Sequence, residues 1–523
     1  MISKSWQKNL LFWGVLGVLC LVYAYQKVLF FQPHGMHNWR QADCISLSQN
    51  FIEEKNPFKP AIHNFISDDR TSGKTAGEFT GVYYLMGRIW ELTGVQTWIF
   101  RLFNLLVMSL ACFSLYRTLQ RLWNDNFWSL FMSLLLFASP LIVFYTPNFL
   151  TDITALAFTV WGWSLYIRYS LEGRRKQLIS SFVLFALAAL LKITAGITIL
   201  SLLGVIGLEA IGLWRKSALR IHKPWRTIGI GALAFLAVFG WYYYASVYNS
   251  IHGGKYTFND LWPIWGIKQE NYEAGMKYFK DMMINEFFHG FLTIMIVLMS
   301  VAGLVLAFMK SGRMAVLLLI AMTGSTMYLL FWFGAFEGHD YYFINLLMLP
   351  ILMTGVFIHY HHLIGPKLNI ALKVVCFAAF ITSVVFSASG IRLRYSEKLA
   401  YSKELAESMY SKEEIDFWTW MSLTYKDRGL FTMEAYNRKL GIKKSDLVIV
   451  LPDPSFNIAL TRLSQKGWSN YGNAHTAERY LQLKNSGAKY LIINKFEQTD
   501  LEPLKPLMTD SIGFYEGFTV YKL

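Results

Sequence analysis

Long apolar runs alternate with short polar loops along roughly the first three quarters of the chain. A run of about 20 apolar residues is long enough to cross a bilayer as a helix. Such runs lie near residues 10–31, 97–116, 127–145, 150–169, 178–194, 195–213, 227–247, 288–309, 314–335, 343–363 and 370–390. The pattern therefore predicts a polytopic α-helical membrane protein with about eleven transmembrane helices.

The stretch 178–213 leaves two interpretations open. Its apolar sequence is interrupted only around Lys192-Ile193-Thr194. It forms either two spans or a re-entrant hairpin. Both arrangements return the chain to the same side of the membrane, so the rest of the predicted topology is the same.

Basic residues mark one side of the membrane. Lys4 and Lys8 precede the first span, and the loop after every even-numbered span carries Lys or Arg, most densely at 213–226. Because loops rich in Lys and Arg stay in the cytoplasm, the N-terminus is predicted to be cytoplasmic. Loop 32–96 and the tail then lie outside. The chain divides into a membrane domain, 1–390, and an extracytoplasmic domain, 391–523.

The first outer loop, 32–96, is long for a connection and is predicted to have its own structure. Apolar residues recur at helical spacing from Trp39 until Asn56-Pro57 ends the pattern. A second apolar stripe runs from Val82 to Leu92, with Tyr and Trp residues that suit a membrane interface. We expect two amphipathic helices lying on the outer surface.

The tail has the pattern of a small α/β domain. Strand character is found at 446–451, 489–494 and 512–521, and helical character at 403–425, 476–485 and 501–508. The domain either covers an active site and helps to select its substrate, or is a structural cap. The sequence leaves both roles open.

Composition supports the membrane assignment. Hydrophobic residues make up 54% of the chain and charged residues only 16%, below the roughly 25% of soluble domains. The net charge of +15 resides mostly in short loops, so it indicates topology and contact with anionic lipid. No nucleic-acid module is recognised. The four cysteines form no CxxC or Cys/His cluster, so neither a zinc site nor a disulfide framework is indicated.

Polar residues that are costly near a bilayer gather on the predicted outer side. They are Arg40, Asp43 and Glu78 in loop 32–96, Asp152 at the start of a span, Lys192, and His339 and Asp340 before Tyr341 and Tyr342. Each has an ordinary explanation. Arg40 and Asp43 form a local ion pair, Asp152 caps its helix, and Lys192 extends toward the interface. Together, a carboxylate, several cations and a histidine suit a reaction on a lipid phosphate.

Four short motifs resemble the C-type integral-membrane glycosyltransferases, in particular bacterial proteins similar to protein O-mannosyltransferases and to the lipid A aminoarabinose transferase. They are His37-Asn-Trp-Arg-Gln-Ala-Asp43, Gly77-Glu78-Phe79 followed by Tyr83-Tyr84, Thr151-Asp152, and Gly338-His339-Asp340-Tyr341-Tyr342. The resemblance covers about the first 390 residues by layout.

This resemblance implies a sugar donor on a polyprenyl phosphate, an acceptor presented outside the membrane, and Asp43 as the catalytic base. It implies no metal and no cofactor. A phosphate leaving group needs positive charge and hydrogen-bond donors, and the candidates are Lys192, Arg40 and His339. The candidates for binding sugar or acceptor are Glu78, Asp152, Asp340, Tyr341 and Tyr342.

The sequence therefore predicts an inverting glycosyltransferase in a bacterial cytoplasmic membrane, with membrane lipid around it and a lipid, glycan or protein as acceptor. Two hypotheses from other classes stay open. A transporter or lipid-linked sugar flippase would have charges near the membrane midplane at discontinuous helices. A non-catalytic envelope scaffold would have Asp43 and Glu78 far apart and facing water.

Overall fold

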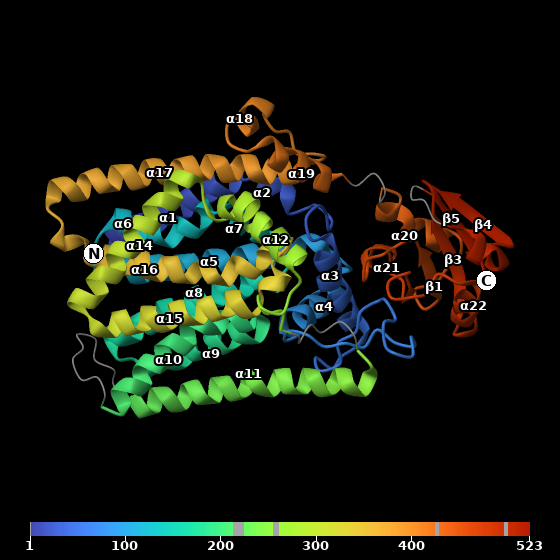
Figure 1. The fold of residues 1–523 in the computed structure, drawn as a ribbon, viewed down its shortest axis with the longest axis horizontal. Helices are drawn as coiled ribbons and strands as arrows, with labels where there is room; N and C mark the ends of the chain where they lie inside the picture. Colours follow the sequence, from blue (N-terminus) through green and yellow to red (C-terminus); the bar gives the residue numbers. More distant parts are fainter. Residues whose placement is uncertain (1, 213–223, 255–260, 424–427, 496–499) are drawn as a thin grey trace.

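The chain forms a helical bundle with a small sheet domain at one end (Figure 1). The computed structural model describes residues 2–212, 224–254, 261–423, 428–495 and 500–523. The predicted basic loop therefore lies mostly outside the described residues. Within them the protein is mostly helical, as predicted.

The bundle consists of helices that correspond in order to the predicted apolar runs. They are α1 (Ile2–Val22), α2 (Tyr25–Val28), α5 (Thr97–Trp123), α6 (Asn126–Leu134), η1 (Leu135–Ala138), α7 (Pro140–Tyr145), α8 (Thr151–Glu172), α9 (Arg175–Leu191), α10 (Gly196–Ala210), α11 (Pro224–His252), α14 (Gly290–Lys310), α15 (Gly312–Phe331), η5 (Asp340–Leu347), α16 (Met348–His359) and α17 (Pro366–Arg394). Between α11 and α14 the chain forms α12 (Gln269–Tyr278) and α13 (Ile284–Phe287). The protein is thus a multi-pass membrane protein.

Seven of the described helices are long and apolar enough to span a membrane. They include α5, α11, α14, α15 and α17, together with the stretches 193–210 and 340–363. Shorter apolar helices occupy 6–22 and 126–138. The count of about eleven spans remains a prediction.

Two predicted spans are interrupted. The run 10–31 is divided where Ala24 adopts a left-handed conformation between α1 and α2. The run 127–145 is divided between η1 and α7. Pro140 begins α7 because it has no N–H to donate to a preceding turn, and the Ser139 hydroxyl accepts the Ile142 N–H as its cap. Apolar run length alone missed both breaks.

The stretch 178–213 forms two helices, α9 and α10, that meet at Lys192 through the short turn η2 (Ile193–Ala195). Lys192 is paired with Asp152 at the start of α8. At the far end of α10, Glu209 is paired with Arg313 at the start of α15. The helix α9 therefore runs toward Asp152, and α10 runs away from it.

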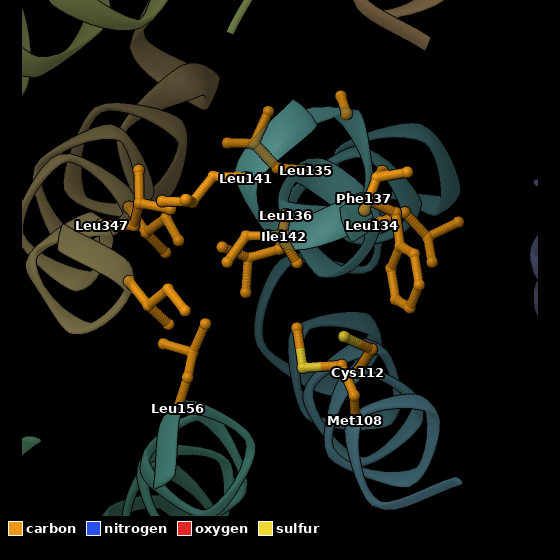
Figure 2. Packing of buried hydrophobic residues seen from close by; sticks show 14 of the residues in the cluster. Met108, Cys112, Leu134, Leu135, Leu136, Phe137, Leu141, Ile142, Leu156 and Leu347 are labelled. Atoms are coloured by element: carbon orange, nitrogen blue, oxygen red, sulfur yellow. The ribbon is translucent and has the colours of Figure 1, made fainter. Parts of the chain in front are cut away.

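The bundle is held together by one large apolar core. Figure 2 shows its centre, where Met108 and Cys112 of α5, Leu156 of α8 and Leu347 of η5 surround the broken segment 134–142. Burial of these side chains fixes α8, which carries Asp152, and η5, which carries Asp340, Tyr341 and Tyr342.

The first outer loop contains the two predicted helices, α3 (Asn38–Glu53) and α4 (Gly81–Thr93). They pack against each other. Every residue of α3 from Gln41 to Ser48 is buried. A helix lying on a membrane surface would have one exposed face, so this burial is more extensive than predicted. The reason is that α21 (Ile458–Leu463) of the tail also packs on α3.

The tail domain is a five-stranded mixed sheet with strand order β2-β1-β3-β5-β4. Its strands are β1 (Leu447–Leu451), β2 (Gly467–Trp468), β3 (Ala488–Asn494), β4 (Asp510–Tyr515) and β5 (Phe518–Lys522). Its helices are α18 (Lys403–Glu407), α19 (Lys412–Ser422), α20 (Leu430–Lys439), α21, α22 (Ala477–Asn485) and η8 (Glu502–Leu507). The tail is thus α/β, as predicted.

Three local predictions in the tail were wrong. The expected helix 403–425 is two helices, separated before Ser411 caps α19; its end at 424–425 lies outside the described residues. The helix expected at 501–508 is a 3-10 turn, because Pro503 and Pro506 supply no N–H. The strand expected at 512–521 is a hairpin that turns at Glu516 and Gly517, both with positive φ.

Candidate active site

A cavity of about 1350 Å³ is lined by residues from one end of the bundle, from the first outer loop (residues 32–96) and from the tail domain. Eight of the nine predicted site residues line it: Arg40, Asp43, Glu78, Asp152, Lys192, His339, Tyr341 and Tyr342. They come from segments separated by up to 302 residues (Arg40 to Tyr342). Their convergence is a property of the fold that no single motif contains.

Asp43 lies on α3, one turn after Arg40, and only 2% of its surface is exposed. The segment leading into α3 is fixed by Gln41, whose amide donates to the carbonyl oxygens of His34 and Met36 at 2.9 and 2.8 Å. One oxygen of Asp43 accepts a hydrogen bond from Asn457 Nδ2 at 3.0 Å. The carboxylate is therefore buried at the cavity wall in a defined orientation.

Glu78 is held at the cavity by Arg40 and by the hydroxyl of Tyr83. Burial alone would raise the pKa of the Glu78 carboxyl. The Arg40 guanidinium and the Tyr83 hydrogen bond outweigh burial, and they hold that pKa below its usual value. Glu78 is therefore ionised at neutral pH and orients Arg40.

Lys192 is placed at the cavity by the break between α9 and α10. Its ammonium is 2.7 Å from an oxygen of Asp152 and lies over the ring of Tyr342, 4.5 Å from the centroid. Asp152 is on the first turn of α8. A lysine ammonium has three N–H donors, so Lys192 can contact Asp152 and an oxygen of a ligand together.

Asp340 is the predicted residue that does not line the cavity. It is 1% exposed and lies behind His37, which contacts it at 2.9 Å, and it accepts a hydrogen bond from the Tyr145 hydroxyl at 2.6 Å. His37 itself lines the cavity and packs edge-on against Tyr341. Asp340 thus orients His37 and has no direct access to a ligand in the cavity.

His339 faces the cavity beside His37, with 5.8 Å between the two ring centroids. Burial, together with the neighbouring His37, lowers the pKa of His339 from its ordinary value. At pH 7 its imidazole is therefore neutral. The Glu337 carbonyl oxygen accepts the Nδ1–H of this ring at 2.8 Å, so Nε2 of the neutral imidazole is a hydrogen-bond acceptor. Lys192 and Arg40 therefore supply both the charge and the N–H donors that suit a phosphate.

The cavity is lined by apolar as well as charged side chains. Trp262, Met327 and Phe331 contribute apolar surface, and Phe456 and Tyr471 contribute aromatic surface from the tail domain. Together with the charged residues, this lining suits an amphiphilic ligand with an apolar chain and an anionic head.

Sequence reasoning missed several residues of this site. Asn457, Phe456 and Tyr471 reach it from the tail domain, more than 400 residues after Asp43. No local spacing signals such a contact. His37 was part of the recognised motif but had no assigned role. In the described part of the chain, no three His, Cys, Asp or Glu side chains are grouped so that they could hold a metal ion.

Residues 80–244 match the family model of dolichyl-phosphate-mannose-protein mannosyltransferase. No curated protein sequence matches the chain.

Among solved structures, ArnT from Cupriavidus metallidurans in the apo state has a TM-score of 0.53 at 12% identity, covering 100% of this chain and 98% of that chain. The same protein bound to undecaprenyl phosphate has a TM-score of 0.55 at 14% identity, with 98% of each chain covered. The archaeal oligosaccharyltransferase AglB from Archaeoglobus fulgidus has a TM-score of 0.48 at 11% identity, covering 94% of this chain and 70% of that chain.

The fold is therefore shared with ArnT over nearly the whole of both chains. The resemblance to C-type membrane glycosyltransferases that the motifs indicated is confirmed by this shared fold and by the family match over 80–244.

Proposed function

We propose that this protein is an inverting glycosyltransferase that moves a sugar from a polyprenyl phosphate to an acceptor outside the cytoplasm. One observation carries the proposal: a buried carboxylate, Asp43, shares a single cavity with Arg40 and Lys192, and apolar side chains line part of that cavity. The family match and the fold shared with a protein that binds undecaprenyl phosphate support it.

The chemistry follows from the positions of these side chains. Asp43 takes the proton of the acceptor hydroxyl, and the acceptor oxygen forms the new bond to the anomeric carbon. The bond from that carbon to the phosphate oxygen breaks on the opposite face, and the polyprenyl phosphate leaves with the electron pair, which inverts the configuration. Lys192 and Arg40 balance the charge of the leaving phosphate and donate hydrogen bonds to it. Neutral His339 gives its Nδ1–H to the Glu337 carbonyl, and its Nε2 accepts a hydrogen bond from a hydroxyl of the bound sugar.

The other polar residues have supporting roles in this proposal. Glu78 and Asp152 accept hydrogen bonds from sugar hydroxyls while they orient Arg40 and Lys192, and Tyr341 and Tyr342 flank the sugar. Asp340 acts through His37. The prenyl chain lies along Trp262, Met327 and Phe331, and the acceptor enters beside the tail domain.

The placement in the cell belongs to the same proposal. The protein lies in a bacterial cytoplasmic membrane with its N-terminus in the cytoplasm and its cavity and tail outside. The basic loops favour this orientation. The acceptor is an envelope glycan, lipid or protein.

The scaffold hypothesis required Asp43 and Glu78 to lie apart and to face water, yet both line one cavity and Asp43 is buried. A transporter is not favoured by any specific observation, since the cavity charges lie at helix ends and in outer loops.

The decisive experiment is a transfer assay on purified protein in lipid. It uses a panel of radiolabelled polyprenyl-phosphate sugars with membrane extract as acceptor. Asp43→Asn removes the base but keeps the shape of the side chain. We expect its turnover to fall by about 10²–10⁴-fold, the usual contribution of general base catalysis, with donor affinity unchanged. Retained turnover in this variant would refute the proposed role of Asp43.

A further inference from the structure

A residue of the tail domain reaches the proposed catalytic base. The amide of Asn457 donates to Asp43 at 3.0 Å across a sequence separation of 414 residues. Asn457 is fully buried and Asp43 is 2% exposed. A hydrogen bond to a charged, buried acceptor is among the stronger polar contacts in a protein.

The orientation of the Asn457 amide is determined by its second partner. The backbone N–H of Asn64 donates to Asn457 Oδ1 at 3.0 Å. A backbone N–H can only donate, so the oxygen of the amide must face Asn64. The NH₂ group therefore faces Asp43, and it acts there as a donor.

Asn457 does not serve the helix that it precedes. It is the N-cap residue of α21, a position where asparagine usually caps the first turn with its own side chain. Here it makes no such bond. Instead Ser455 accepts the Ile458 N–H at 2.9 Å, and Asp453 accepts the Ala459 N–H at 2.8 Å. The Asn457 side chain is thus directed at Asp43 while neighbouring residues cap the helix.

The tail is fixed to the first outer loop beside this contact. Asn64 donates to the Phe456 carbonyl at 2.8 Å and to the Ser469 hydroxyl at 2.9 Å. The same loop pairs with the edge strand β2, where Phe65 N–H donates to the Gly467 carbonyl at 2.8 Å and Gly467 N–H donates to the His63 carbonyl at 3.1 Å. These contacts therefore fix the position of Asn457 relative to Asp43 on α3.

From this geometry we propose that Asn457 is a positioning residue for Asp43. Its N–H fixes the rotation of the carboxylate and favours the ionised form, which is the form that accepts a proton. The tail domain then forms part of the catalytic centre. The inference rests on the proposed role of Asp43 as the base.

Other titratable and charged groups surround Asp43, and the test leaves all of them in place. They are Arg40 and Cys44 on α3, Glu78 before α4, Lys192 after α9, His37, His339, Tyr471 in the tail and Arg462 on α21.

The test is the substitution Asn457→Asp. The new carboxylate still accepts from the Asn64 N–H, so the contact between the tail and the first loop is retained. The donor to Asp43 is lost and a like charge takes its place, which raises the pKa of one carboxyl of such a pair. We expect the acid limb of the kcat profile to move upward by about one pH unit or more, so that turnover falls about tenfold at pH values on that limb. Turnover should recover as the pH rises.

The matched control is Asn485→Asp at the end of α22 in the same domain, where the side chain is exposed. It adds the same charge on the surface of the tail and should keep the wild-type profile. A second variant, Asn457→Ala, removes the donor without adding charge. We expect a smaller shift in the same direction. Melting temperature and donor affinity are measured for each variant, and neither should explain the loss of turnover.

The outcomes separate the two proposals. If Asp43→Asn keeps its turnover, the proposed function is overturned. If Asp43→Asn is inactive but Asn457→Asp and Asn457→Ala both give the wild-type pH profile and turnover, the positioning role is overturned while the function stands.

Discussion

At the scale of single residues, two basic side chains that line the cavity are each paired with a carboxylate. Arg40 contacts Glu78, and Lys192 contacts Asp152. Such pairing stabilises buried charge and holds the long side chains in place before a ligand binds. A phosphate then meets donors that are already oriented, so less conformational entropy is lost on binding.

Lys192 gives the sharpest test of this arrangement. Lys192→Gln removes the charge that faces the donor phosphate. A hydrogen bond to a charged group contributes about 1.5–3 kcal/mol, so the Kd for undecaprenyl phosphate should rise by roughly 10–100-fold. The measurement is equilibrium binding of undecaprenyl phosphate to purified protein in detergent.

Two further variants make this result interpretable. Lys277→Gln removes an exposed lysine of α12 and should leave the Kd unchanged. Lys192→Gln combined with Asp152→Asn avoids leaving the Asp152 carboxylate without its partner. Wild-type affinity in the double variant would show that Lys192 only neutralises Asp152.

Sequence reasoning found most of the site because its residues belong to compact motifs at the ends of apolar runs. Arg40 and Asp43 share a helix face, and Lys192 interrupts an apolar stretch where a charge is costly. Asp340 was predicted to contact the ligand because it follows His339 in the motif. A motif shows which residues are neighbours in sequence, but it does not show which of them are buried behind the cavity wall. Asn457 was missed because hydrogen bonds across 414 residues leave no periodic trace.

At the scale of elements, glycine decides how closely two bundle helices approach. A Cβ on Gly303 of α14 would lie 2.2 Å from the Met353 carbonyl oxygen of α16. Small residues at such crossings allow close backbone packing in membranes. The close packing of α14 against α16 thus depends on the absence of a side chain at position 303.

Gly303→Ala should therefore destabilise the bundle. Alanine favours a helix over glycine by about 1 kcal/mol, but overpacking a tight contact costs about 1–3 kcal/mol, so the second effect dominates. The melting temperature in detergent should fall. Gly240→Ala on α11 is the control because nothing lies within 4 Å of its Cβ. A melting temperature for Gly303→Ala equal to or above that of Gly240→Ala would contradict the tight crossing.

Helix breaks show where sequence patterns lose precision. Pro140 lies inside a continuous apolar run, so a hydropathy average over that run does not detect it. Because proline has no backbone N–H, it does not continue the preceding helix and instead begins α7. The break at Lys192 was visible because a charge marks it. Breaks caused by backbone conformation alone, as at Ala24, have no such marker.

At the scale of the whole molecule, the tail domain and the first outer loop form one continuous structure around the cavity. The general layout was predictable, because the thickness of the bilayer sets the length of the apolar runs and basic loops stay in the cytoplasm. The docking of the tail was not predictable, because it depends on specific polar contacts such as Asn64 with Phe456 and Ser469. Such contacts have no composition signature.

The proposed orientation can be tested by labelling single introduced cysteines. Glu478→Cys places a thiol on α22 of the tail, and Arg174→Cys places one in the turn between α8 and α9. Both positions are exposed, whereas Cys44, Cys112 and Cys376 are buried and Cys20 is half-buried within α1. Background labelling of the native protein should therefore be low.

A membrane-impermeant maleimide applied to intact spheroplasts should label Glu478→Cys and leave Arg174→Cys unlabelled until the membrane is permeabilised. The reason is that basic residues around Arg174 retain that turn in the cytoplasm, while the tail lies on the side where the cavity opens. The reverse pattern would place Asp43 and the donor phosphate in the cytoplasm. Labelling of both positions in intact spheroplasts would contradict any single fixed orientation.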